Sequence, residues 1–168
     1  VEKAGLKPVA IWLTHGHLDH VGGTVELSKR YELPIIGPQK EDAFWLDALP
    51  EQSQMFGFPR HEAFSPTRWL EHGETLTLGE ETFEVRFTPG HTPGHVVLFK
   101  ETAKIVFVGD VLFSGSIGRT DFPRGNHQEL MDSIKTQLWP MEDDVVVVSG
   151  HGPNTSIGHE RKTNAHVR

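Results

Sequence analysis

The chain has 168 residues, a formal net charge of -7 and no cysteine. The acidic balance argues against a nucleic-acid-binding protein, which ordinarily carries a basic face. Without cysteine there is no disulfide framework, no thiol nucleophile and no thiolate metal ligand, which is consistent with a cytoplasmic protein. No apolar stretch reaches the roughly 20 residues of a membrane-spanning helix, so length and composition fit one soluble globular domain over residues 1–168.

The first part of the chain is predicted to alternate strands and helices around one polar segment. Residues 9–13 form a continuous apolar run, which is typical of a strand buried on both faces. After the polar segment, the spacing of apolar residues predicts helices over 24–31 and 39–49, with a short strand over 33–36 between them. Residues 50–70 show no period, so we expect a long loop there.

Two hairpins are predicted in the middle of the chain. Apolar and charged residues alternate over 82–87, so this strand has one wet face and pairs with the strand over 75–78. The second hairpin joins residues 95–100 to residues 104–108. Strands joined by short turns are neighbours in a sheet, so we expect one antiparallel sheet in this region.

The last part of the chain is predicted to hold a helix, a buried strand and a final short helix. Asn126 is a predicted helix cap, with Glu129 three positions later as in a capping box. Pro140 ends that helix. A strongly β-branched strand over 145–148 follows, and a short helix is expected to start near Thr155.

One short segment concentrates groups that bind metals. Three imidazoles and a carboxylate lie within six positions, at His15, His17, Asp19 and His20. In an extended segment His15 and His17 point the same way, because side chains alternate between faces. Asp19 and His20 follow where the chain must turn, so they can reach a second, adjacent position. Imidazole and carboxylate suit zinc, iron or manganese, and the segment therefore predicts a site for two metal ions.

Other potential ligands also lie next to apolar strands. His91 and His95 lie in the loop between the two hairpins, Asp110 follows the strand over 104–108, and His151 follows the strand over 145–148. Ligands that collect at the carboxyl ends of strands form a site at one edge of a rigid scaffold.

These segments match known motifs in order and spacing. They are His-Gly-His-Leu-Asp-His at 15–20, Thr-Pro-Gly-His-Thr-Pro-Gly-His at 88–95, Val-Gly-Asp at 108–110 and Ser-Gly-His-Gly at 149–152. The set resembles the metallo-β-lactamase fold superfamily, and within it the hydroxyacylglutathione hydrolases (glyoxalase II) and their compact bacterial relatives. The resemblance implies a mixed α/β fold, the αββα sandwich. Members normally begin with a hairpin and a strand before the first motif, so we expect an N-terminally incomplete domain that lacks the first strands of one sheet.

The resemblance also implies a ligand set for two divalent metal ions, with zinc expected first and iron or manganese as alternatives. One ion would take His15, His17 and His95, and the other would take Asp19, His20 and His151. Asp110 would bridge the two. Because the family's ligand is taken as the histidine of the second Pro-Gly-His, His95 is preferred over His91, which is expected to lie outside the ligand set.

The implied reaction is hydrolysis of a small-molecule thioester such as S-lactoylglutathione by a metal-bridging hydroxide, with Asp19 and Asp110 as the catalytic carboxylates. A thioester suits such a site because a departing thiolate needs little protonation. Arg119 lies in the loop after Asp110 and could bind a substrate carboxylate, although pairing with Asp121 is equally expected. No nucleic acid or membrane partner is predicted.

Two alternatives stay open. The segment Gly-Arg-Thr-Asp-Phe at 118–122 also resembles persulfide dioxygenases of the same fold, which work with one iron held by two histidines and a carboxylate. In that case one histidine of the first motif, His95 and Asp110 would form the triad. The third possibility is a metal-binding member of the fold that performs no chemistry.

Overall fold

A computed structural model describes residues 2–167, so the two end residues of the domain predicted over 1–168 lie outside the described part. Its centre is a six-stranded sheet with the order β10-β9-β6-β5-β4-β3, in which only β6 and β9 pair in parallel. The six strands are β3 (Thr75–Leu78), β4 (Glu81–Phe87), β5 (Val96–Lys100), β6 (Ile105–Gly109), β9 (Val146–Ser149) and β10 (Thr155–Ser156). Both predicted hairpins are therefore confirmed.

Two small sheets complete the strands, and helices cover the central sheet. The small sheets are a parallel pair, β1 (Ile11–Trp12) with β2 (Ile35–Ile36), and an antiparallel pair, β7 (Leu112–Phe113) with β8 (Ser116–Ile117). The α-helices are α1 (Leu18–Val21), α2 (Thr24–Tyr31), α3 (Ala43–Asp47), α4 (Leu49–Phe56), α5 (His127–Ser133) and α6 (Ile157–Thr163). Short 3₁₀ turns span Glu2–Ala4, Lys40–Asp42 and Glu101–Ala103, and a π-helical turn over Ile134–Leu138 continues α5.

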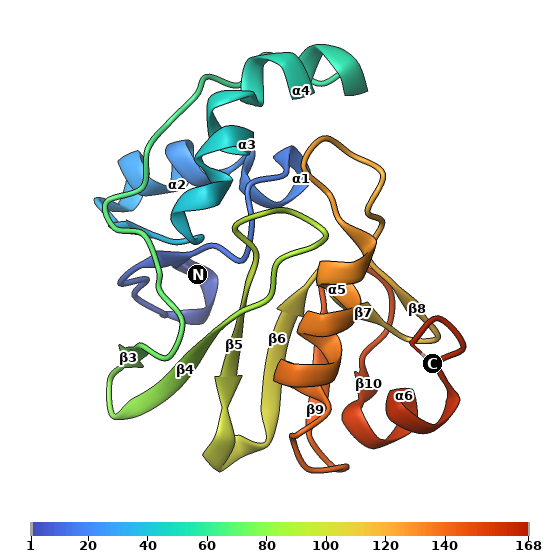
Figure 1. The fold of residues 1–168 in the computed structure, drawn as a ribbon. Coiled ribbons are helices and arrows are strands. Elements are labelled where there is room, and N and C mark those ends of the chain that lie inside the picture. The colour runs from blue at the N-terminus through green and yellow to red at the C-terminus, as the bar shows by residue number, and fades with distance from the viewer. Residues whose placement is uncertain (1, 168) are drawn as a thin grey trace.

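The helices are distributed unevenly around the sheet. Figure 1 shows α1 to α4 gathered beyond one end of β5 and β6, while α5 lies across β6 and β9. Leu130 on α5 and Ile134 on the π-helical turn that continues it are fully buried against Val106 and Val147 of the sheet. Apolar burial of this kind is the main stabilising contribution in a domain of this size. The predicted mixed α/β class is confirmed.

The predicted helix start at Asn126 is also confirmed. The Asn126 side-chain oxygen accepts the backbone N–H of Glu129 at 3.2 Å, which satisfies one of the free donors at the start of α5. The backbone N–H of Asn126 itself donates to the carbonyl of Gly90 at 2.8 Å. The start of α5 is thereby tied to the loop between β4 and β5, where two of the candidate ligands lie.

Two expectations were wrong. Residues 49–56 form α4 instead of the start of a long loop, because the inward face of this helix carries Leu49, Gln52 and Ser53, whose polar members hide the apolar period. Gly57 ends the helix with a φ of 70°, a conformation that glycine adopts without steric cost. The strand over 9–13 is reduced to Ile11 and Trp12, which are only half-buried, because β2 is its one partner strand among the described residues.

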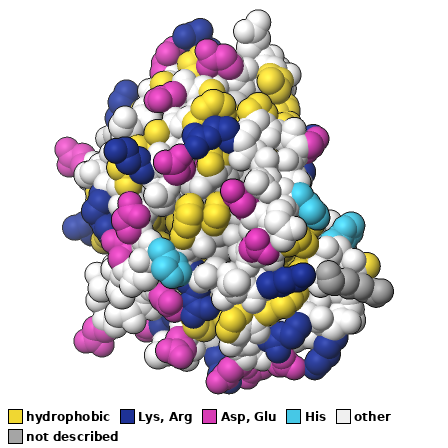
Figure 2. Space-filling view, viewed as in Figure 1, with side chains coloured by type: hydrophobic (Ala, Val, Ile, Leu, Met, Phe, Trp, Pro, Cys, Tyr) yellow, Lys and Arg dark blue, Asp and Glu magenta, His cyan; other side chains and the backbone are white. Residues whose placement is uncertain are grey.

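The surface agrees with the composition. Figure 2 shows acidic and basic side chains intermixed over the face in view, as expected for a chain of net charge -7. Within the part of the chain that the structure describes, no helix is both long and apolar enough to cross a membrane.

Candidate metal centre

The candidate ligands are held by loops that meet at one edge of the fold. His15 and His17 lie between β1 and α1, and Asp19 and His20 lie on α1 itself. Asp110 follows β6 directly. Because β6 and β9 are parallel neighbours, His151, two residues after β9, emerges at the same edge as Asp110. His91 comes from the loop between β4 and β5.

The backbone approaches the ligands closely at one glycine. A Cβ atom on Gly150 would lie 2.3 Å from Asp110 Oδ1 and 2.7 Å from the Cε1 atom of His20. No side chain can be accommodated at these distances, so the sequence Ser-Gly-His at 149–151 requires its glycine. This close approach lets the loop after β9 bring His151 to the carboxylate of Asp110.

The ligand atoms fall into three overlapping groups, each with its atoms within 4.8 Å of one another. They are His15 with His17 and His91, then His15 with His20 and Asp110, and finally Asp19 with His20 and His151. Six of the seven predicted ligands are thereby brought together. The first and third groups share no residue, and the second connects them.

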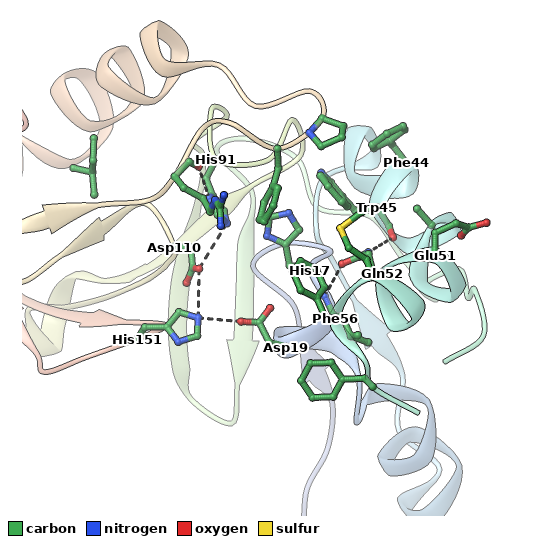
Figure 3. Close-up of a pocket in the computed structure, with 18 of the residues that line it drawn as sticks. His17, Asp19, Phe44, Trp45, Glu51, Gln52, Phe56, His91, Asp110 and His151 are labelled. Carbon is green, nitrogen blue, oxygen red and sulfur yellow. Dashed lines mark hydrogen bonds and ion pairs between the residues drawn. The ribbon is translucent and has the colours of Figure 1, made fainter. Parts of the chain in front are cut away.

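The Asp110 carboxylate lies between the two outer groups (Figure 3). Its Oδ1 atom is 3.3 Å from His20 Nε2, while its Oδ2 atom is 3.6 Å from His91 Nε2 and 3.5 Å from His151 Nε2. Asp19 lies on the far side of His151, with its Oδ2 atom 3.0 Å from His151 Nε2. One carboxylate thus faces both groups of imidazoles.

The donor atoms fit divalent metal ions. The Nε2 atoms of His15, His17 and His91 and the Oδ1 atom of Asp110 are buried and have no hydrogen-bond partner. Leaving a buried polar atom unpaired is costly, and such atoms are rare in native proteins. Four of them converging on one place is explained by cations that accept their lone pairs, and a set of imidazole and carboxylate suits zinc, iron or manganese.

The protonation states agree with this role. Burial lowers the pKa of His17 to about 3, and burial together with the neighbouring imidazoles lowers the pKa of His15 well below its usual value. These rings are therefore neutral and keep the lone pair that a metal ion needs. For Asp110, burial raises the pKa, but the adjacent His20 imidazole outweighs it, so the net pKa is lowered and the carboxylate is ionised.

The preference for His95 over His91 does not agree with the geometry. The His95 ring is fully buried, its Nε2 accepts the backbone N–H of Asp110 at 3.1 Å, and its Nδ1 lies 3.3 Å from the Thr88 hydroxyl. Both ring nitrogens are thus engaged, whereas His91 has a free Nε2 aimed at the ligands. Both rings are buried, so the difference comes from how the loop between β4 and β5 folds against Asp110 and not from exposure.

Asp42 is a residue that the sequence analysis did not single out. It is fully buried, and burial raises its pKa to about 6. Its carboxylate accepts the backbone N–H of Gly16 at 2.8 Å, the backbone N–H of Gly94 at 2.5 Å and the hydroxyl of Thr92 at 2.9 Å. Asp42 therefore joins the segment that carries His15 and His17 to the loop that carries His91.

A cavity of about 750 Å³ opens beside the candidate ligands. His17, Asp19, His91, Asp110 and His151 lie on one side of it, and the opposite wall comes from α3, α4 and residues 122–123 (Figure 3). Most cavities that bind small molecules are apolar with a few polar groups placed at one end. The cavity therefore gives a substrate access to the proposed metal ligands.

Arg119 also lines this cavity, but its guanidinium is already engaged. It forms two hydrogen bonds to the Asp121 carboxylate, at 2.7 and 2.6 Å, and it lies 3.8 Å above the centre of the Phe122 ring. The ion pair between Arg119 and Asp121, which the sequence analysis considered, is therefore present in the structure. A contact between Arg119 and a substrate stays a prediction.

The fold and the donor set together define a class of protein. The chain belongs to the Metallo-beta-lactamase superfamily, whose family model matches residues 1–151. The resemblance that the motifs indicate is confirmed, and the family supports a metal-dependent hydrolase.

Individual relatives and solved structures resemble this chain over nearly its whole length. Hydroxyacylglutathione hydrolase GloC of Haemophilus influenzae is 46% identical over 165 residues, which cover 98% of this chain and 78% of that protein. Among solved structures, the BLEG-1 B3 metallo-beta-lactamase superposes with a TM-score of 0.90 at 38% identity, covering 99% of this chain and 80% of that one. TTHA1623, solved in a di-iron-bound form, has a TM-score of 0.89 at 36% identity over 98% of this chain and 80% of that one.

Proposed function

We propose that this chain is a hydrolase that uses two divalent metal ions to cleave a thioester such as S-lactoylglutathione. The observation that carries the proposal is the position of the Asp110 carboxylate, which lies within 3.6 Å of His91 in one group of potential ligands and of His20 and His151 in the other. A site for a single ion would have no use for the second group. The relative solved with two irons and the relative named as a hydroxyacylglutathione hydrolase support the same assignment.

The ligand assignment follows the geometry. His15, His17 and His91 would hold the first ion, and Asp19, His20 and His151 would hold the second. Asp110 would bridge them. This differs from the motif-based expectation only in replacing His95 by His91. Zinc remains the first expectation for the metal, and iron is the alternative that the di-iron relative supports.

The chemistry divides between the ions and the chain. When bound, a pair of divalent ions activates water and polarises a carbonyl oxygen. The chain supplies orientation: Asp110 and Asp19 line the cavity beside the reacting bond, and the hydrogen bond from His91 Nδ1 to the carbonyl of Arg119 leaves Nε2 free as an acceptor. A thiol leaving group has a pKa of about 8.5, so no protein acid has to protonate it. This agrees with a site whose buried histidines are neutral.

The test combines metal content with an activity assay. We expect elemental analysis of protein purified without added metal to give two ions per chain, and the same protein to hydrolyse S-lactoylglutathione. The variant Asp110→Ala should retain the fold and lose at least 100-fold in kcat/KM, because bridging and orientation are both removed. Two bound ions without any thioesterase activity would refute the thioester assignment.

The dioxygenase alternative gives a different result in the same experiment. A single iron per chain, with oxygen uptake in the presence of glutathione persulfide, would replace the hydrolase by an oxygenase. A single iron would leave the second group of candidate ligands, Asp19 with His20 and His151, unused, and this group therefore favours the hydrolase.

A further inference from the structure

The wall of the cavity opposite the metal ligands is apolar. Phe44, Met55, Phe56 and Phe58 line it, and 40 to 70% of each of these side chains is exposed in the structure. Large exposed apolar side chains gathered at one place mark a binding surface, whereas scattered ones do not. Here they share one cavity, and Phe56 packs edge to face with Phe122 on the same wall, with ring centres 6.1 Å apart.

The charges around the cavity also favour an uncharged ligand group. Arg119 is the one lysine or arginine among the described residues that line it, and its guanidinium is paired with Asp121. Glu51 on α4 adds a negative charge to the same wall as Met55 and Phe56. A ligand group carrying carboxylates would meet Glu51 and no unpaired cation on this wall, which makes its burial unfavourable.

We propose that the apolar wall of α3 and α4 selects a thioester with an uncharged aliphatic or aromatic group on one side of the scissile bond, and that Glu51 discriminates against anionic groups. This rests on the proposed thioester hydrolysis. The acyl C–S bond breaks, a C–O bond forms from water, and the released sulfur carries the remaining proton. The apolar group is either the acyl chain or the thiol, and the experiment below separates the two.

The first arm varies the acyl chain on one neutral thiol. S-acyl derivatives of N-acetylcysteamine from acetyl to hexanoyl serve as substrates, with the succinyl derivative as the anionic member. We expect kcat/KM to rise by about threefold for each methylene buried, on the order of 100-fold over the series, and the succinyl derivative to be poor. The second arm keeps the lactoyl group and compares hexanethiol with glutathione as the thiol. A preference confined to the first arm assigns the wall to the acyl chain, and one confined to the second arm assigns it to the thiol.

Two variants test the residues, each with a matched control on α2. Phe56→Ser should reduce the preference for the longest chain about tenfold. Leu27→Ser changes a similarly exposed apolar side chain away from the cavity and should leave this preference unchanged. Glu51→Lys should raise kcat/KM for the anionic thioester at least threefold without favouring the neutral ones. Glu26→Lys, the same charge change on exposed α2, should not.

The outcomes distinguish this inference from the proposed function. Hydrolysis that ignores chain length in both arms, or that favours the glutathione thioester over every neutral one, overturns the inference and leaves the thioesterase standing. If no thioester is hydrolysed, calorimetry with S-hexyl-N-acetylcysteamine, an uncleavable thioether, tests the wall directly. Binding that Phe56→Ser abolishes supports the inference, and the absence of binding overturns it.

Discussion

The ring of His91 and the backbone carbonyl of Arg119 are joined by a hydrogen bond of 2.7 Å. The carbonyl accepts the Nδ1–H, so the proton is fixed on that nitrogen and the lone pair of Nε2 is left facing Asp110. Metal-binding histidines are usually oriented in this way by a second hydrogen bond. The loop after β8 thereby sets the orientation of a proposed ligand on a different loop, and it does so with its backbone.

His91 and His95 should respond in opposite ways to substitution. We expect His91→Ala to lower metal affinity at least 100-fold, because Nε2 has no protein partner, while the loss of the hydrogen bond from Nδ1 to the Arg119 carbonyl costs the metal-free protein only about 1 kcal/mol. His95→Ala should destabilise the metal-free protein by about 1–3 kcal/mol, because it leaves the N–H of Asp110 unpaired. Metal titration and thermal melts of both variants check this. Loss of metal in His95→Ala with full binding in His91→Ala would restore the motif-based assignment.

Asp121 should control whether Arg119 is available to substrate. The Arg119 guanidinium lowers the pKa of Asp121 to about 2, so the pair is intact at every pH above about 4. In Asp121→Asn the guanidinium is released, and we expect KM for an anionic thioester to fall several-fold. Arg119→Ala alone should change this KM by less than twofold, yet cancel the gain in the Asp121→Asn background. Steady-state kinetics of the four proteins form a double-mutant cycle, and equal effects of Arg119→Ala in both backgrounds would contradict the pairing argument.

The sequence located the segments that carry the candidate ligands better than it predicted which of their atoms point into the candidate site. His15, His17, Asp19 and His20 were identified because alternation and the following turn fix their directions locally. The choice between His91 and His95 depends on how the loop between β4 and β5 folds against Asp110, and no local pattern encodes that contact. Asp42 was missed for the same reason: its three partners lie 26 to 52 residues away in the sequence.

The secondary structure also divides into elements with local sequence signals and elements that depend on distant contacts. The hairpins β3–β4 and β5–β6 and the cap of α5 were predictable because their signals lie within a few neighbouring residues. Helix α4 was not, because Gln52 is buried by accepting the N–H of Leu18 at 2.9 Å and donating to the carbonyl of Trp45 at 2.8 Å. A hydrophobic pattern counts every polar side chain as exposed, including one that is buried because its hydrogen bonds are made inside the protein.

The metal-free protein should lose stability in acid. Burial lowers the pKa of His15, His17, His91 and His95, so as the pH falls below about 6.5 the unfolded state takes up protons that the folded state does not. The stabilising contribution is complete above pH 6.5 and is lost down to about pH 3, on the order of 5 kcal/mol for His17 alone. For His20 burial lowers the pKa, but Asp110 and Asp19 outweigh it and raise the net value, and burial raises the pKa of Asp42 to about 6. These two groups oppose the trend that the four buried histidines set.

Urea unfolding at pH 4 to 8, after removal of metal with a chelator, measures this slope. His17→Asn removes one of the four groups and should flatten it, while His159→Asn, which alters an exposed histidine on α6, should not. A free energy of unfolding that stays constant or rises between pH 7 and pH 5 would contradict the burial of neutral imidazoles.

Asp42 should be required for both the fold and the site, although it touches neither the proposed metal ions nor the cavity. In Asp42→Ala the N–H groups of Gly16 and Gly94 and the hydroxyl of Thr92 lose their acceptor inside the protein, which costs about 1–3 kcal/mol for each group. Thr92→Val removes one donor together with its need for an acceptor, so it should cost at most about 1 kcal/mol. Because Asp42 ties the loop of His91 to the segment of His15 and His17, we expect metal affinity to fall in parallel with stability in Asp42→Ala and to stay near the original value in Thr92→Val. Chemical denaturation and metal titration of both variants measure the two quantities, and an Asp42→Ala protein as stable as Thr92→Val would show that the three hydrogen bonds do not hold the loops together.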